Sequence, residues 1–193
     1  MRTKRLSRIF LTCGLLLINS VGYLSAFDVS LDGTFNVFND ERFSSQSKNL
    51  GIYIDLDDNM IIGPVWGDVR LNLKNEKDNY FYSGSAETFN IRTIMDLTEV
   101  NSFHFSSGLD LGWSNVRLDN GTNFKGTNQS APIIDVFTGI AYKPKSEKWH
   151  SGTIFLNLGY RWWSLNSINN PFGANSKVIN NLDGWFITFG IGL

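Results

Sequence analysis

The sequence predicts an all-β protein, an eight-stranded antiparallel transmembrane β-barrel with up-and-down topology. Three observations lead to this prediction. Eight segments alternate between apolar and polar residues, the connections between them alternate between long and short, and none of the apolar faces carries a charged residue. The 193 residues suit a single domain, and the charged content of 18% lies below the roughly 25% of soluble domains.

The first 26 residues have the layout of a secretory signal peptide. Four basic residues precede an apolar run over 9–18, and the small residue Ala26 marks the cleavage point. The run is too short to span a bilayer, and an N-terminal core helix is the alternative. We therefore divide the chain into a signal peptide, 1–26, and a barrel, 27–193. Cys13 lies within the signal peptide, so the mature chain forms no disulfide.

Removal of the signal peptide takes four basic residues and no acidic residue from the chain. The formal net charge changes from −1 to −5. An acidic exported protein is a poor candidate for nucleic-acid binding, because such binding depends on neutralising phosphates with Lys and Arg.

Reading every second residue locates the strands. They are expected at 27–37, 50–56, 65–73, 89–97, 103–113, 134–142, 154–162 and 185–193. In the first strand, Phe27, Val29 and Leu31 share a face opposite Asp28 and Ser30. The strand lengths are close to the ~9–11 residues that cross a bilayer at a tilt, and an even strand count is usual for bacterial barrels.

The same alternation defines an apolar face on each later strand. These faces are Leu50–Ile52–Ile54–Leu56, Val65–Gly67–Val69–Leu71–Leu73, Phe89–Ile91–Thr93–Met95–Leu97, Phe103–Phe105–Ser107–Leu109–Leu111–Trp113, Ile134–Val136–Thr138–Ile140–Tyr142, Ile154–Leu156–Leu158–Tyr160–Trp162 and Trp185–Ile187–Phe189–Ile191–Leu193. We expect all of them to face lipid.

The connections support this topology. Long ones are expected at 38–49, 75–87, 114–131 and 164–183, and short ones at 57–60, 98–101 and 143–148. Outer-membrane barrels have short periplasmic turns and longer outer loops. An N-terminus in the periplasm places every long connection outside.

A soluble barrel or sandwich is the alternative fold. Polar and apolar residues alternate along its strands too, but its charged face meets water and its apolar face forms the core. Aromatic residues near the ends of the apolar faces favour the membrane, because amphipathic rings collect at the headgroup level. These residues are Trp113, Tyr142, Tyr160, Trp162 and Trp185.

The polar faces then line the lumen and are expected to form a charge network. Its members are Asp28, Asp32, Asp55, Asp68, Arg70, Arg92, Asp96, Asp110, Asp135 and Arg161. Because an isolated buried charge is costly, the three arginines are expected to pair with the carboxylates. Structural ion pairs are favoured over a transport path.

Inward glycines leave room in so narrow a lumen. The aromatic residues expected to point the same way are Tyr53, Trp66, Phe137, Phe155 and Phe186. If these rings fill the room, the lumen is closed; if they do not, a cavity or narrow channel remains.

The C-terminal segment adds a resemblance. Apolar residues stand at the last position and at every second position before it: Trp185, Ile187, Phe189, Ile191 and Leu193. This pattern resembles the terminal strand of outer-membrane proteins that the barrel-assembly machinery reads, although that strand usually ends in Phe or Trp. Over its mature length the chain resembles small eight-stranded barrels of the OmpA-domain, OmpX and OmpW type. The resemblance implies location in the bacterial outer membrane, surrounded by its lipid. The outer loops could contact lipopolysaccharide, a host surface or a phage, or serve only as the polar caps that any barrel needs.

Some barrels of this size modify lipid A, and such an activity requires a catalytic site. His104 shares a strand face with Ser106 and Asp110, but these residues lie about 7 and 20 Å away along the strand. Unless another strand supplies a carboxylate, no triad forms. We therefore expect His104 and His150 to be non-catalytic residues at the periplasmic rim of the barrel, and we predict no catalytic residue.

Metal and cofactor sites are not expected either. With two histidines and no cysteine outside the signal peptide, the chain lacks the set of side chains that a transition-metal site requires. Asp55, Asp57 and Asp58 could hold a loose cation, but a solvated acidic turn is favoured.

Three functions follow from this reading. The first is a structural or surface-interaction role through the outer loops of a monomeric barrel. The alternative is a small channel for ions or solutes, and the third is a lipid A-modifying enzyme.

Overall fold

The computed structural model describes residues 28–38, 43–75, 80–118, 127–143, 152–168 and 179–193. Within them lie β1 (Asp28–Phe38), β2 (Phe43–Asp57), β3 (Met60–Asn75), β4 (Tyr80–Val100), β5 (Phe103–Leu118), β6 (Thr127–Tyr142), β7 (Ile154–Ile168), β8 (Ile179–Asn181) and β9 (Gly184–Gly192). No helix in this part of the chain is long and apolar enough to span a bilayer. The predicted signal peptide lies outside the described residues.

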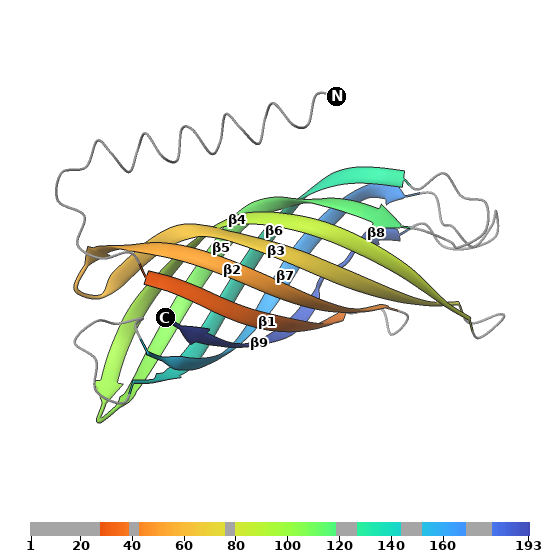
Figure 1. Ribbon diagram of the computed structural model, residues 1–193. Helices are drawn as coiled ribbons and strands as arrows, with labels where there is room; N and C mark the ends of the chain where they lie inside the picture. The colour runs from red at the N-terminus through yellow and green to blue at the C-terminus, as the bar shows by residue number, and fades with distance from the viewer. Residues whose placement is uncertain (1–27, 39–42, 76–79, 119–126, 144–151, 169–178) are drawn as a thin grey trace.

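Eight of these strands close into one barrel, as predicted. Each strand from β1 to β7 pairs antiparallel with its successor, and β9 pairs with both β7 and β1. The three-residue strand β8 pairs only with β7 and does not belong to the ring. Figure 1 shows β1 and β9 side by side, with the start of β1 and the end of the chain at the same end of the barrel. In outer-membrane barrels that end faces the periplasm, and we call it the periplasmic end.

The wall has its polar face inside and its apolar face outside. On β5 Asp110 is fully buried while Leu111 is 50% exposed, and on β6 Asp135 is fully buried while Ile134 is 42% exposed. The large exposed apolar side chains therefore form the outer surface of the barrel. A soluble barrel would bury this face, so the pattern is that of a barrel surrounded by lipid.

An aromatic row marks where the apolar band ends on the outer side. The strand register places Trp66, Phe89 and Trp113 directly beside one another on β3, β4 and β5. At the next outward-facing position toward the outer end, Asp68 on β3 is the register partner of Glu87 on β4, and both side chains are exposed. The step from aromatic to charged residues is typical of the boundary between lipid and water.

Beyond this boundary the polarity of the wall reverses. Many inward positions of the outer third are apolar and at most 2% exposed: Val69, Leu71, Ala86, Val116, Ala131, Ile133, Trp163 and Leu182. The buried hydroxyl side chains Ser45, Ser47, Thr88 and Ser114 lie among them. The outward positions at the same levels, such as Gln46, Asn115 and Arg117, are polar and exposed. In this part of the barrel the outer face is polar and the inner face is largely apolar, as in a water-soluble barrel.

The reversal explains the one strand whose orientation was predicted wrongly. On β3, Val65, Val69 and Leu71 face the lumen, and Trp66, Asp68 and Arg70 face outward. The prediction assigns the apolar face of every strand to lipid. Much of β3 lies beyond the aromatic row, where the outer wall meets water, so its apolar face turns inward.

The connections also differ from the prediction. Strands β2, β4 and β6 begin at Phe43, Tyr80 and Thr127, so much of the expected loops 38–49, 75–87 and 114–131 is strand. The outward-facing apolar residues end at the aromatic row, but the strands continue to pair with one another beyond it, where their outer face meets water. At the periplasmic end, the turns 58–59 and 101–102 are as short as expected, whereas β6 ends at Tyr142 and β7 begins only at Ile154.

Candidate functional site

A row of four charged residues crosses the lumen wall on neighbouring strands. Arg92 on β4 is register partner of Asp110 on β5, Asp110 of Asp135 on β6, and Asp135 of Arg161 on β7. All four are at most 5% exposed. We call these four residues the charged belt. The belt exists because each strand contributes one charge at the same register position of its inward face.

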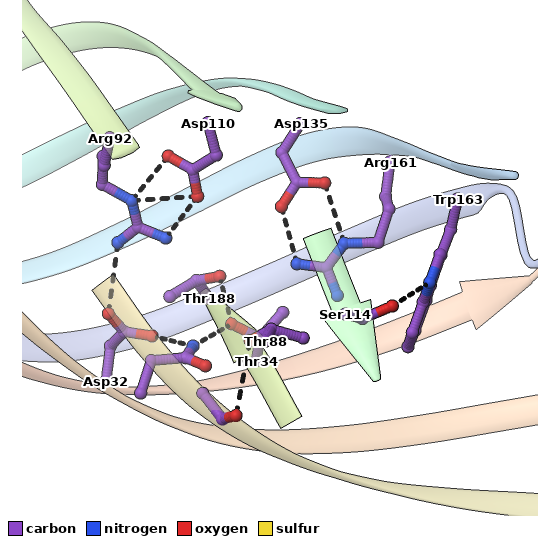
Figure 2. Close-up of polar contacts among 12 residues, drawn as sticks. Asp32, Thr34, Thr88, Arg92, Asp110, Ser114, Asp135, Arg161, Trp163 and Thr188 are labelled. Carbon is purple, nitrogen blue, oxygen red and sulfur yellow. Dashed lines mark hydrogen bonds and ion pairs between the residues drawn. The ribbon is translucent and has the colours of Figure 1, made fainter. Parts of the chain in front are cut away.

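Arg92 is the hub of the first ion-pair group, which Figure 2 shows. Its Nε lies 2.8 and 3.1 Å from the two carboxylate oxygens of Asp110, and its Nη2 lies 2.8 Å from Asp110 Oδ2. Its Nη1 lies 3.2 Å from Asp32 Oδ2 on β1 and 3.4 Å from Tyr53 Oη on β2. One guanidinium thus joins β4 and β5 to strands across the lumen.

Arg161 forms the second group with Asp135. Its Nε and Nη2 donate to the two Asp135 oxygens at 2.8 and 2.6 Å, a bidentate pair. The guanidinium also lies over the rings of Trp163 and Phe186, with distances of 5.7 and 5.5 Å to their centroids. Trp163 in turn donates through Nε1 to Ser114 Oγ at 2.7 Å, as Figure 2 shows.

Neutral polar side chains extend the Arg92 group along β1. Asn49 on β2 donates to both Asp32 and Thr34, and Thr34 shares a 2.8 Å hydrogen bond with Thr188 on β9. Because these bonds cross the β2–β1–β9 seam, they tie the first and last strands of the closed barrel together.

Aromatic rings occupy the space that the inward glycines leave. Phe137 lies against the positions that side chains on Gly108 and Gly159 would need, and Phe155 and Phe186 do the same at Gly190 and Gly159. Tyr53, Phe137 and Phe186 form one buried cluster with the lumen-facing Ile61, Val65 and Ile94. Of the five rings expected to fill the lumen, four do so, and Trp66 instead faces outward.

A small cavity remains on the periplasmic side of Arg92. Its volume is about 20 Å³, and its lining includes Ser30, Tyr53, Ser106 and Phe155. That is room for about one water molecule.

At the periplasmic rim, a second strand does supply a carboxylate to His104. Asp96 Oδ2 on β4 lies 2.7 Å from His104 Nδ1, and Glu99 Oε1 lies 3.8 Å from its Nε2. The nitrogen that would serve a nucleophile in a triad therefore faces a second carboxylate. Asp96, His104 and Glu99 thus form one cluster at the rim, in which both ring nitrogens of the histidine face carboxylates.

Lys143, which directly follows β6, is buried beside this cluster. Burial lowers the pKa of its ammonium group, while the carboxylates of Glu99, Asp28, Asp96 and Asp55 partly oppose that shift. Its backbone N–H donates to Ser102 O at 2.8 Å, which attaches the end of β6 to the β4–β5 turn. The rim thus brings the ammonium group of Lys143 close to carboxylates from several strands.

The structure separates the ten residues predicted for the lumen network into three groups. Asp32, Arg92, Asp110, Asp135 and Arg161 come together as described. Asp28 and Asp96 lie at the periplasmic end of the lumen, and Asp55 is exposed there. Asp68 and Arg70 lie on the outer surface.

The prediction missed the uncharged members of the network, Asn49, Thr34, Thr188 and Ser114, and also Trp163. Inward alternation places each of them in the lumen, but nothing in the sequence distinguishes them from other inward polar residues. Asp57 and Asp58 are exposed, and the described residues hold no group of three or more His, Cys, Asp or Glu arranged for a metal ion. His150 lies outside the described residues.

The predicted assembly signal occupies the lipid-facing side of β9. Trp185, Ile187, Phe189, Ile191 and Leu193 are all outward, between 38% and 58% exposed. The alternation of buried and exposed residues along β9 is strict.

Comparison with known proteins supports the architecture. Among solved structures, Neisserial surface protein A is similar, with a TM-score of 0.58 and 15% sequence identity over 89% of this chain and 98% of that chain. The fold is that of the small outer-membrane β-barrels. At this identity the likeness shows the fold alone.

Two further outer-membrane structures align over most of their length. They are OprG from Pseudomonas aeruginosa, with TM-score 0.48, 12% identity and coverage of 89% and 98%, and Ail from Yersinia pestis, with TM-score 0.44, 10% identity and coverage of 86% and 96%. No protein-family model and no curated protein sequence matches the chain.

Proposed function

We propose that this protein is a non-conducting outer-membrane barrel that acts at the bacterial surface through its outer third and the connections there. The proposal treats residues 1–26 as the signal peptide and β9 as the strand that the barrel-assembly machinery reads. It makes the protein a monomer whose partners are outer-membrane lipid and lipopolysaccharide, without enzymatic activity.

The observation that carries the proposal is the filling of the lumen. The Arg92–Asp110–Asp32 group crosses the lumen, the aromatic cluster packs around it, and the apolar side chains of the outer third lie further out. A pore for ions needs a continuous water path, and each of these layers stands across such a path. The channel hypothesis therefore has less support than a closed barrel.

A second observation favours a role at the surface. Strands β2 to β6 continue past the aromatic row with an exposed polar outer wall that carries Lys48, Asp68, Arg70, Glu87 and Arg117. A wall that only needed to cross the bilayer could end at the row. The structural neighbour from Neisseria is itself, by name, a surface protein.

The test is planar-bilayer conductance of the refolded protein, with heat-modifiable gel mobility to show that it is folded and a porin as positive control. We expect no discrete conductance steps. Reproducible steps from the folded protein would overturn the closed barrel and favour the channel.

The surface location has its own test. Cells expressing the protein with an epitope inserted at 119–126 or 76–79 should bind the antibody without permeabilisation. Labelling only after permeabilisation would contradict the proposed orientation.

A further inference from the structure

One strand edge of the barrel wall is open beyond the aromatic row. The register of β6 with β7 ends at the pair Ile133–Trp163, whereas the register of β6 with β5 continues to the start of β6. Within the part of the chain that the structure describes, residues 127–131 of β6 therefore pair with a strand on one side only. Pro132 is the register partner of Trp113 in the aromatic row, so these residues lie on the water side of the lipid boundary. We call the unpaired side of residues 127–131 the open edge.

The outer end of β7 is held by β8 rather than by β6. Trp163 donates its backbone N–H to Asp183 Oδ1 at 2.6 Å, and its carbonyl oxygen accepts the N–H of Leu182 at 2.9 Å. Beyond Trp163, β7 pairs with β8. The outer ends of β6 and β7 thus belong to two different strand pairs, β5–β6 and β7–β8.

The direction of the backbone groups on β6 follows from the same contacts. In an antiparallel strand, the N–H and C=O of one residue point to one neighbouring strand, and those of the next residue point to the other. Since the groups of Trp163 point away from β6, those of Trp162 point toward it and meet its register partner, Ile134. Two residues further out on β6, Pro132 also faces β7, and it has no N–H to donate. The ladder between β6 and β7 ends at this proline.

Two residues beyond Pro132 present backbone groups on the open edge. Counting outward in steps of two places the N–H and C=O of Ser130 and Asn128 on this edge. The groups of Gln129 and Ala131 point to β5, with which β6 is paired along this whole segment. The open edge therefore offers two N–H donors and two C=O acceptors at the spacing of a strand.

The open edge lacks the charges that usually protect such edges. Natural proteins block exposed strand edges with lysine and other charged residues, proline or bulges, because an unprotected edge pairs with other chains. Residues 127–132 read Thr-Asn-Gln-Ser-Ala-Pro, and residues 164–168, at the outer end of β7, read Ser-Leu-Asn-Ser-Ile. Neither segment contains a charged residue, and Pro132 blocks pairing only at the inner end.

A second copy of the chain in the same membrane does not fit the open edge. Both copies keep the same end toward the periplasm, so the axis that relates them is parallel to the membrane normal. Strands of outer-membrane barrels are tilted by about 35–45° from that normal, so the facing edges of two copies would cross at twice the tilt, about 70–90°. Paired strands differ in direction by only about 20–25°. The occupant must be a chain that is free to align with β6.

We propose that the open edge of β6 is a docking site for an extended peptide segment of another protein, which joins the sheet as an additional strand beside Asn128 and Ser130. The inference rests on the proposed location of the outer third at the cell surface. Main-chain hydrogen bonds supply the affinity in this mode of recognition. An extended polypeptide fits because its own N–H and C=O groups repeat at the spacing that the edge offers.

The test is amide hydrogen exchange of the refolded barrel, measured by NMR in detergent micelles. In the free barrel, the N–H groups of Asn128 and Ser130 should exchange faster than those of Gln129 and Ala131, which bond to β5. The probe is a peptide of alternating threonine and valine with blocked ends. With this peptide at about ten times its Kd, exchange at Asn128 and Ser130 should slow by about tenfold, because exchange then proceeds from the free fraction. The same peptide with every amide nitrogen methylated should have no effect.

A pair of variants at Ser130 provides the matched control. Ser130→Pro removes one N–H from the open edge and leaves the bonds to β5 in place, whereas Ser130→Ala keeps that N–H. The alanine variant should bind the peptide as the wild type does, and the proline variant should bind it more weakly. If Ser130→Pro does not fold, the comparison of the two peptides on the wild type decides.

Four results would overturn the inference. They are equal binding by the two Ser130 variants, no slowing by the peptide, slow exchange at Asn128 and Ser130 before peptide is added, and slowing that follows the concentration of the barrel alone. The third would mean that the chain itself covers the edge, and the fourth that a second copy does. None of them contradicts the closed barrel or its surface location, because conductance and epitope labelling test those separately.

Discussion

Arg92 and Asp110 are directly opposite in the register of β4 and β5, and three contacts of 2.8 to 3.1 Å join their side chains. Asp32, on the first strand, reaches the same guanidinium at 3.2 Å. All three side chains are buried, so the pairing of each charge depends on the others. The group links strands that are far apart in the sequence.

Replacing Arg92 by Leu leaves Asp110 and Asp32 buried without their cation. Breaking a buried ion pair from one side typically costs about 3–5 kcal/mol. We expect the free energy of unfolding, measured with guanidinium in detergent micelles, to fall by that order. The double variant Arg92→Leu/Asp110→Leu should recover part of the loss, since it removes one of the unpaired charges.

Arg70 provides the matched control. Its side chain is exposed on the outer wall, so Arg70→Leu should change stability by no more than about 0.5 kcal/mol. A loss as large as that of Arg92→Leu would show that burial does not distinguish the two arginines.

The fold could be predicted from the sequence because a strand that crosses lipid needs apolar side chains at every outward-facing position. On seven of the eight barrel strands, the face that the alternation made apolar is the face that meets lipid. The lumen position of Arg92, Asp110, Asp135 and Arg161 follows from the same alternation. Their mutual pairing depends on strand register, which alternation leaves undetermined.

The exception, β3, shows what a periodicity argument lacks. Alternation reveals that two faces differ but not which solvent each meets, and along one strand the outer solvent changes from lipid to water. Val69 and Asp68 can be assigned only after the aromatic row of Trp66, Phe89 and Trp113 fixes the boundary. That row depends on the register of three strands.

The orientation of β3 can be tested by cysteine labelling, because the only native cysteine, Cys13, lies in the predicted signal peptide. In a protein that begins at Phe27, Asp68→Cys should react rapidly with a polar maleimide, while Val69→Cys should react only after unfolding. Val69 is fully buried and Asp68 is exposed. The opposite order of reactivity would restore the orientation that the apolar pattern alone suggested.

The lipid boundary predicts a strong position dependence for charge on the outer face of β5. Leu109 lies near the middle of the apolar band, so Leu109→Arg should cost about 2–4 kcal/mol of folding free energy. Asn115 lies beyond the aromatic row, so Asn115→Arg should cost about 0–1 kcal/mol. Folding into lipid vesicles, followed by unfolding in guanidinium, gives both values. Equal costs would mean that Trp113 does not mark the boundary.

Lys143 predicts a pH dependence at the periplasmic rim. Because burial lowers the pKa of its ammonium group, the folded barrel binds this proton less well than the unfolded chain does. The cost of the buried charge is present in full below the folded-state pKa. It is relieved as the pH rises from that value to the ordinary pKa of 10.5. Stability should therefore increase across this interval in the wild type and increase less in Lys143→Met, when unfolding is measured at a series of pH values. Parallel curves for the two proteins would show that Lys143 carries its charge in the folded barrel at no cost.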